Sequence, residues 1–163
     1  LSSALTALSR RPMTVFKLRQ RLREKGFSPQ DIEDTVNRLI EWKYLDDRSY
    51  ASTYIRSRGD KLSRKKIWIE LLRAGIDQDL VVKLLAEFYP EDQEYENCRQ
   101  LARKLWSEED IKWERKYRHN LKNKNIPKEI LLKKKVGDKL LLRGYLVSTV
   151  RSVLAQISVR EDF

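Results

Sequence analysis

The apolar residues of this chain recur at helical spacing, and one arrangement of them appears three times. Each copy has two apolar positions four residues apart, then a glycine, a bulky apolar residue and two more apolar positions four residues apart. The copies begin at residues 18, 67 and 136, so the internal spacing is kept while the connections differ in length. Recurrence of this kind is typical of tandem helical units. The eighteen positions are Leu18, Leu22, Gly26, Phe27, Ile32 and Val36; Ile67, Leu71, Gly75, Ile76, Val81 and Leu85; and Val136, Leu140, Gly144, Tyr145, Val150 and Leu154.

Each copy predicts two helices joined by a turn, because four-residue spacing places both members of an apolar pair on one helix face. The glycine predicts a left-handed residue at the end of the first helix, and the bulky residue after it is expected to pack back on that helix. Hydroxyl and carboxylate side chains stand where helices are expected to start. These predicted N-caps are Thr14, Ser28 (followed by Pro29 and Asp31), Ser63 and Asp77. The third copy has Leu146 at the position of Asp77, so its second helix is expected to have a weaker cap or to begin at Ser148.

A further helix is predicted ahead of each pair, over residues 4–9, 48–58 and roughly 92–106. No segment alternates with period two for long enough to predict a strand. The predicted fold is therefore all-α: an elongated, curved array of three tandem three-helix units that resemble helix-turn-helix repeats. The predicted units are residues 1–45, 46–90 and 91–163, the last with a basic insertion near 107–128.

The charge of the chain is strongly and unevenly positive. The formal net charge is +11, and residues 99–145 hold fifteen lysines and arginines against six acidic residues. A positive field of this size favours a polyanion or an acidic protein groove as partner. The alternative is that the lysines only solvate a long helix.

Several classes of protein are not expected from the composition. The chain has no run of about 18 apolar residues, the length that crosses a membrane, and no charged-then-apolar leader. Its one cysteine, Cys98, excludes an internal disulfide and fits a reducing compartment. We therefore expect a cytoplasmic protein that contacts no membrane, and we expect a monomer.

The residues offer little for catalysis. The adjacent pair Asp46 and Asp47 could belong to a metal-dependent nuclease, but no spacing supplies further carboxylates, and a cap by Asp47 on the helix with Tyr50 and Tyr54 is favoured. His119, the only histidine, has no cysteine nearby to complete a zinc site. We predict no enzyme, no metal and no cofactor.

The candidate contact residues for a partner are cations on the predicted helices and one tryptophan. Arg64, Lys65 and Lys66 correspond, at the repeat offset, to Lys133, Lys134 and Lys135, which indicates a basic stripe that could follow a phosphate backbone. Trp113, among basic residues, could be exposed and stack on a base. The full set of candidates is Arg64, Lys65, Lys66, Arg73, Lys133, Lys134, Lys135, Arg143, Arg19, Arg23 and Trp113.

The central part of the chain resembles the RecX family of bacterial recombinase regulators. The run Leu45-Asp46-Asp47-Arg48-Ser49-Tyr50-Ala51, followed by Arg56, Arg58, Ile67, Glu70, Leu71, Gly75 and Ile76, carries the resemblance. The opening segment from Ala4-Leu5 to Arg10-Arg11 and the turn at Gly144-Tyr145 also fit. The family often has Gly-Pro where this chain has Ser63 and Arg64, a departure that adds a charge and a cap.

The resemblance implies a non-enzymatic protein that binds the RecA filament on single-stranded DNA and restrains it. It implies lowered ATP hydrolysis, strand exchange and co-protease activity, and so regulation of DNA repair and the SOS response. Single-stranded DNA, and secondarily double-stranded DNA, are the expected nucleic-acid partners. Two alternatives stay open: a stand-alone DNA-binding protein of the helix-turn-helix type, and a nuclease acting through Asp46 and Asp47.

Overall fold

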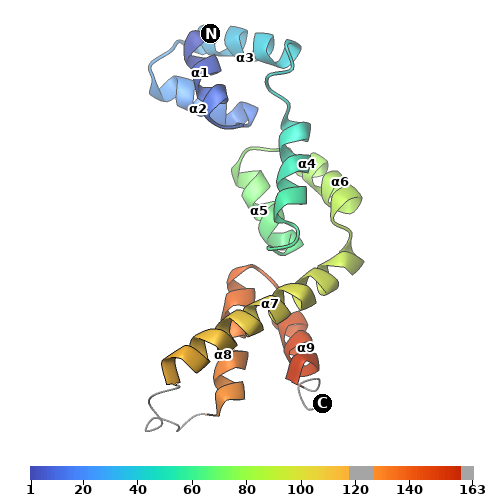
Figure 1. The fold of residues 1–163 in the computed structure, drawn as a ribbon. Coiled ribbons are helices and arrows are strands. Elements are labelled where there is room, and N and C mark those ends of the chain that lie inside the picture. Colours follow the sequence, from blue (N-terminus) through green and yellow to red (C-terminus); the bar gives the residue numbers. More distant parts are fainter. Residues whose placement is uncertain (118–126, 159–163) are drawn as a thin grey trace. The chain divides into compact units, whose positions relative to one another are not determined.

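The chain is all-helical in the part that the structure describes, residues 1–117 and 127–158 of a computed structural model (Figure 1). No strand occurs in these residues, as the sequence predicts. The helices are α1 (Ser2–Arg10), α2 (Val15–Glu24), α3 (Pro29–Glu41), α4 (Asp47–Arg58), α5 (Arg64–Arg73), α6 (Gln78–Phe88), α7 (Glu91–Tyr117), α8 (Lys128–Leu142) and α9 (Val147–Ser158). They follow the predicted order, in which one helix precedes each helix–turn–helix pair.

The predicted helix starts are confirmed at four caps. The hydroxyls of Thr14, Ser28 and Ser63 accept hydrogen bonds from the backbone N–H three residues further on, at 3.2, 3.1 and 3.1 Å. The Asp77 carboxylate accepts from the N–H groups of Asp79 and Leu80. Each cap satisfies backbone donors that have no partner within their helix. In the third copy α9 begins at Val147, directly after Leu146.

The three glycine turns share one hydrogen-bond pattern. Gly26, Gly75 and Gly144 have φ of +82°, +82° and +88°, the left-handed conformation predicted for them. The N–H after each glycine bonds to the carbonyl five residues earlier, and the glycine N–H bonds to the carbonyl three residues earlier. This is the Schellman motif, which ends a helix and sets the direction of the next one.

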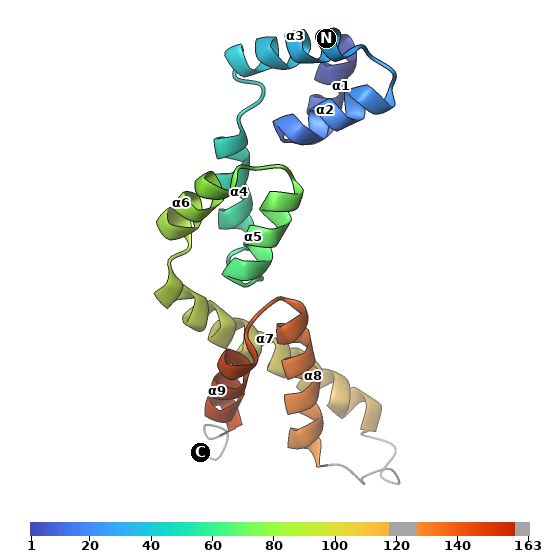
Figure 2. The ribbon, with the colours of Figure 1, turned by 180° about the vertical axis from the view of Figure 1, so that it is seen from behind.

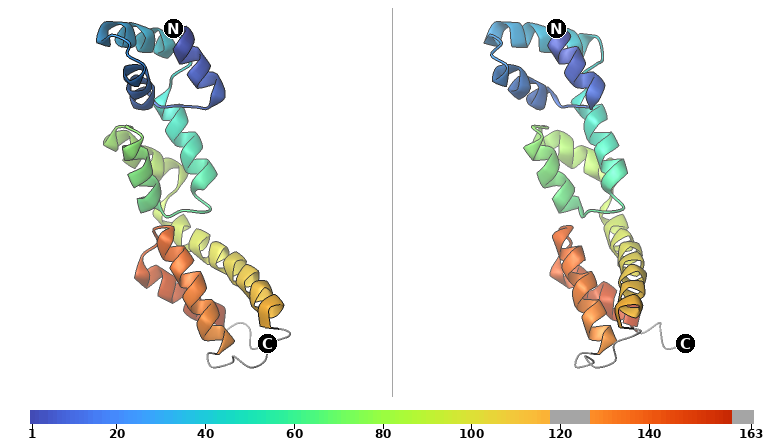
Figure 3. Two further views of the ribbon diagram at one scale, coloured as in Figure 1. Left: turned by 90° about the vertical axis from the view of Figure 1, so that its left-hand side faces the viewer. Right: turned by 60° about the vertical axis from the view of Figure 1, so that its left-hand side comes forward.

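The chain divides into two compact units. The first consists of Leu1–Ser57 with Ile67–Phe88, and the second of Arg58–Lys66 with the residues from Tyr89 onward. In the first unit, α1, α2 and α3 (Figure 2) enclose a core that includes Ala4, Leu18, Ile32 and Leu39. In the second, α7 packs against α8 and α9 (Figure 3), and the core between them includes Cys98, Leu105, Val136 and Val153. The three-unit boundaries at 45/46 and 90/91 stay a prediction.

The same joint between repeats occurs once in each compact unit. In the first unit the Thr14 hydroxyl donates to the carbonyl of Ala74, directly before Gly75. In the second unit the Ser63 N–H donates to the carbonyl of Arg143, directly before Gly144, at 3.0 Å. Thr14 and Ser63 are equivalent in the repeat, and so are Ala74 and Arg143. The N-terminus of one helix pair is therefore seated on the glycine turn of the next pair.

The bulky residue after each glycine behaves differently in the first copy. Ile76 and Tyr145 are buried, as predicted, at 3% and 4% exposure, but the expectation that Phe27 packs back is wrong, because its side chain is 42% exposed. The joint explains this difference. A Cβ at Gly26 would meet nothing within 4 Å, whereas Gly75 and Gly144 are covered by the preceding helix pair. Nothing among the described residues covers the turn at Gly26 in this way.

The helix that begins the third copy is longer than expected. The apolar spacing predicts a helix over roughly 92–106, and α7 continues to Tyr117. Its extra length carries Glu109 and Trp113 into contact with Lys139 and Lys128 of α8. The basic insertion predicted near 107–128 is thus helical over its first half, and its remainder up to residue 126 lies outside the described residues.

Candidate functional site

The three cations at the start of α5 have different surroundings. Arg64 forms an ion pair with Glu91 at 2.9 Å, and its backbone N–H donates to Glu94. Lys66 is half-buried, and its Cβ would lie 2.8 Å from a Cβ at Gly144. Lys65 between them is exposed and has no ionic partner in the described residues. Lys66 therefore lies at the joint, Arg64 links the start of α5 to α7, and Lys65 faces solvent.

The three lysines of α8 follow the same pattern. Lys133 pairs with Glu129 at 2.6 Å, and Lys135 lies 3.5 Å from Glu109. Lys134 is exposed and unpaired within residues 1–117 and 127–158. The two triads differ in setting, because Arg64 begins α5 while Lys133 lies inside α8, which begins at Lys128. The free cations are the two middle residues, Lys65 and Lys134, which are equivalent in the repeat.

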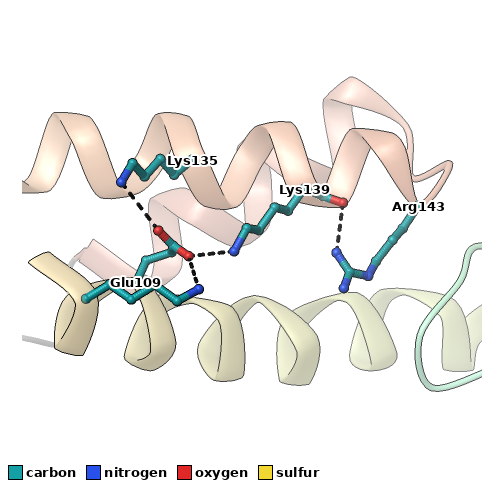
Figure 4. Close-up of polar contacts among 5 residues, drawn as sticks. Glu109, Lys135, Lys139 and Arg143 are labelled. Carbon is teal, nitrogen blue, oxygen red and sulfur yellow. Dashed lines mark hydrogen bonds and ion pairs between the residues drawn. The ribbon is translucent and has the colours of Figure 1, made fainter.

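Arg143 is brought next to the α5 cations by the joint. Its carbonyl accepts from Ser63, and its guanidinium donates to the carbonyl of Lys139 at 3.2 Å. Figure 4 shows Arg143 at the end of α8 beyond Lys135 and Lys139, whose ammonium groups point toward Glu109 of α7. Of the candidates on or next to α8, Arg143 is thus the one that lies directly at the start of α5.

Glu109 is the polar residue that sequence reasoning missed. Its side chain is 5% exposed and lies 2.8 Å from Lys112, 2.5 Å from Lys139 and 3.5 Å from Lys135. The hydrogen bonds from Lys112 and Lys139 lower the pKa of the Glu109 carboxyl from 4.5 to about 2. A carboxylate with several cationic donors stays ionised and joins the helices that carry them. Part of the positive charge of the third copy is therefore neutralised by ion pairs with Glu109.

The candidates of the first unit divide in the same way. Arg19 is held by Glu33 through two parallel hydrogen bonds of 2.9 and 2.6 Å. Arg23 near the end of α2 and Arg73 at the end of α5 are exposed, and neither has an acidic partner among the described residues. Arg23 and Arg73 therefore present free guanidinium groups, and Arg19 does not.

Trp113 is half-buried on the last turns of α7. The Lys128 ammonium lies 4.8 Å from the centre of its ring and also pairs with Asp110 and Glu114 at 2.5 and 2.8 Å. One face of the indole is thus covered by a cation, which leaves less ring surface for stacking. The role of Trp113 in base stacking stays a prediction.

The acidic pair ahead of α4 serves two different helices. Asp46, not Asp47, caps α4, because its carboxylate accepts from the Ser49 N–H at 3.0 Å. The expected cap by Asp47 is therefore wrong. Asp47 is the first residue of α4, and its carboxylate accepts from the Val15 N–H at 2.9 Å, at the start of α2. Partial burial raises the pKa of the Asp47 carboxyl, and the Val15 hydrogen bond opposes that rise.

The described residues hold no group of three or more histidine, cysteine or carboxylate side chains that could bind a metal ion. His119 lies outside the described residues. Burial raises the pKa of the Cys98 thiol to about 12, so that thiol stays protonated and unreactive. In the described part of the chain, every helix is too short or too polar to cross a membrane.

The comparison with known proteins rests on sequence and on structure. A family model described as the first three-helix domain of RecX matches residues 1–39. The regulatory protein RecX of Vibrio vulnificus is 33% identical over 116 residues, which cover 71% of this chain and 74% of that protein. The chain belongs to the RecX family. A crystal structure of RecX from Lactobacillus salivarius superimposes with a TM-score of 0.66 at 22% identity, covering 97% of this chain and 94% of that one, and this RecX structure shows the same fold.

Relatives in the RecX family also differ from this chain in length. The regulatory protein RecX of Caldanaerobacter subterraneus is 34% identical over 102 residues, which are 62% of this chain and 52% of that protein. The match thus spans about half the length of that relative. These relatives carry the name of regulatory proteins, and the resemblance predicted from Leu45–Ala51 and the glycine turns is confirmed.

Proposed function

We propose that this chain binds the RecA recombinase filament on single-stranded DNA and lowers its ATPase, strand-exchange and co-protease activities. In that way it would regulate DNA repair and the SOS response. Membership of the RecX family is the observation that carries the proposal. The net charge of +11 supports it, because a nucleoprotein filament is a polyanion.

The exposed cations are the proposed contact residues. Lys65, Lys134, Arg23 and Arg73 have no acidic partner within the described residues, so their charge is available to a partner. Arg143 joins them because it lies at the start of α5. We propose a smaller contribution to binding from the cations that form internal ion pairs, because such a pair would first have to break. These cations are Arg64, Lys133, Lys135 and Arg19.

The test is a substitution of the two equivalent free lysines. The double variant Lys65→Glu with Lys134→Glu should bind a preformed RecA filament roughly tenfold more weakly at low salt, and its affinity should depend less on salt. Binding can be followed by light scattering or by co-sedimentation with the filament. Helicity should be unchanged, because both side chains are exposed. Lys83→Glu, on an exposed face of α6, is the matched control for a charge reversal.

Unchanged filament affinity in the Lys65→Glu, Lys134→Glu variant would contradict the assignment of these residues. The triple replacement of Arg64, Lys65 and Lys66 by alanine is a poorer test. It would also remove the Arg64–Glu91 ion pair and the packing of Lys66 on Gly144, so a loss of binding could arise from the fold.

A second candidate function is stand-alone DNA binding. The three glycine turns join helices in pairs, as the helix-turn-helix modules of DNA-binding proteins do. A reproducible footprint on one duplex sequence, obtained without recombinase, would favour this alternative. Salt-sensitive binding that does not depend on the duplex sequence would not favour this alternative.

A further inference from the structure

Two adjoining cavities lie in the first compact unit, and none of the candidate contact residues lines them. One has a volume of about 430 Å³ and is bordered by α4 and the segment between α3 and α4; the other, of about 400 Å³, is bordered by α2 and the segment before it. They share Pro12, Met13 and Tyr50, so together they form one groove, here called the α2–α4 groove. Their size is that of sites that hold small organic ligands.

The two halves of the α2–α4 groove differ in chemistry. The α2 half is lined by Arg11, Lys17 and Arg21 against one carboxylate, Glu24. The α4 half is lined by three tyrosines and by hydroxyls that recur every four residues along α4. These residues are Tyr44, Tyr50 and Tyr54, with Ser49, Thr53 and Ser57. Asp46 also lines this half, and its carboxylate accepts from the Ser49 N–H as the cap of α4.

The aromatic walls of the groove are partly fixed and partly open. The Tyr54 hydroxyl donates to Glu70, which holds its ring in place. Tyr50 lies parallel to Tyr54, with ring centres 6.4 Å apart and an angle of 11° between the planes. Tyr44 is 62% exposed, so its ring is free to receive a flat partner.

The residue before Tyr44 carries an unusual backbone. Lys43 has φ of +61° and follows α3 in the position that glycine occupies in the three repeats. Its N–H bonds to the Ile40 carbonyl, and the Tyr44 N–H bonds to the Leu39 carbonyl, which is the hydrogen-bond pattern of the glycine turns. A lysine is strained in this conformation, and glycine would be favoured for stability alone. Lys43 lines the tyrosine half of the groove, so the residue in this strained position is a cationic one at the border of the groove.

Arg21 adds a donor that lacks a partner. Its Nε is buried and forms no hydrogen bond within the described part of the chain. That nitrogen has almost no accessible surface, so any contact of Arg21 with a ligand in the groove would have to come from the rest of its guanidinium group.

We propose that the α2–α4 groove binds a short segment of single-stranded DNA. Arg11, Lys17 and Arg21 would contact phosphates, Lys43 a further phosphate, and Tyr44 would stack on a base. Cations beside exposed aromatic rings are the combination that binds single strands, whereas an acidic peptide would leave the tyrosines without a matching flat group. The proposal rests on the proposed function, in which the strand is that of the filament.

The test uses the chain without recombinase, so that it can succeed or fail independently of filament binding. The probe is a fluorescent oligothymidylate of about 12 nucleotides, within the usual site size of such grooves. Fluorescence anisotropy should show roughly tenfold weaker binding for Tyr44→Ala and near-normal binding for Tyr44→Phe, because phenylalanine keeps the stacking surface. An abasic strand of equal length should bind both variants alike.

Two further variants examine the charged residues. Arg11→Ala with Lys17→Ala should reduce the slope of log affinity against log salt by about 1.4, the value for two lost phosphate contacts on a single strand. Arg38→Ala with Lys83→Ala removes two exposed cations of the same unit outside the groove and is the matched control. Lys43→Gly should weaken binding roughly threefold and yet raise the melting temperature by a few degrees, since it relieves the positive φ.

The outcomes separate the possibilities. Equal losses in the groove pair and the control pair would overturn the proposal, because binding would then depend on net charge alone. Unchanged affinity in Tyr44→Ala, together with displacement of the strand by polyglutamate, would identify the groove as a site for acidic peptide and would also overturn it. Loss of strand binding in the groove variants with normal inhibition of RecA would support the groove and contradict its link to the filament.

Discussion

Gly75→Ala is expected to destabilise the first compact unit by roughly 3 kcal/mol. Part of the loss, about 1–2 kcal/mol, comes from placing a Cβ at a φ of +82°. The rest comes from the joint, because the new Cβ would overlap the Cβ and ring of Phe16. Phe16 cannot move away easily, since its Cβ is attached directly to α2, whose cap Thr14 also bonds to the carbonyl of Ala74. Urea unfolding followed by circular dichroism at 222 nm measures the loss.

Gly26→Ala is the matched control for this prediction. Gly26 has the same φ of +82° and ends its helix with the same hydrogen bonds, but a methyl group added there would have nothing within 4 Å. It should therefore cost only the backbone part, about 1–2 kcal/mol. Equal losses in the two variants would contradict the joint, because the overlap with Phe16 would then have no energetic consequence.

Glu109→Gln is expected to destabilise the second unit by roughly 2 kcal/mol at pH 7. The fall in the Glu109 pKa from 4.5 to about 2 corresponds to roughly 3 kcal/mol, and solvent screening at the partly exposed lysines reduces this. Glutamine removes the negative charge and leaves the ammonium groups of Lys112, Lys135 and Lys139 close together. Thermal or urea unfolding of the full chain at pH 7 measures the change.

The same residue gives stability a dependence on pH with a definite sign. The folded-state pKa is below the unfolded value, so the contribution of Glu109 is complete above about pH 4.5 and is lost as the pH falls toward 2. Over that window the stability of Glu109→Gln should fall less steeply than that of the parent chain. Glu129→Gln, which breaks the exposed pair with Lys133, is the control and should change stability by less than about 0.5 kcal/mol. Parallel pH curves for parent and Glu109→Gln would contradict the assignment.

The features that local sequence encodes were predictable. The caps at Thr14, Ser28, Ser63 and Asp77 and the glycine turns depend on residues within one turn of helix, so the order and type of the helices followed from the sequence. The length of α7 could not be predicted in this way, because its last turns continue past the apolar spacing and are held by contacts with α8.

Features that depend on distant residues could not be predicted. Asp47 accepts a hydrogen bond from Val15, 32 residues earlier, and nothing next to Asp47 indicates that partner. Glu109 lies in a run of acidic residues that looks solvent-exposed, and only the packing of α8 on α7 shows it to be buried. The candidate cations were found as a set, but which of them are free depends on acidic partners such as Glu33, Glu91 and Glu129.

The most direct test of the central claim follows ATP hydrolysis by RecA on single-stranded DNA while this chain is added below the RecA concentration. A chain that binds the filament and restrains it should slow hydrolysis at ratios well under one molecule per RecA subunit. The slowing should weaken as salt increases, because the proposed contact residues are free cations such as Lys65 and Lys134. Hydrolysis that stays at the rate of RecA alone, from low to high salt and up to equal concentrations, would contradict the account.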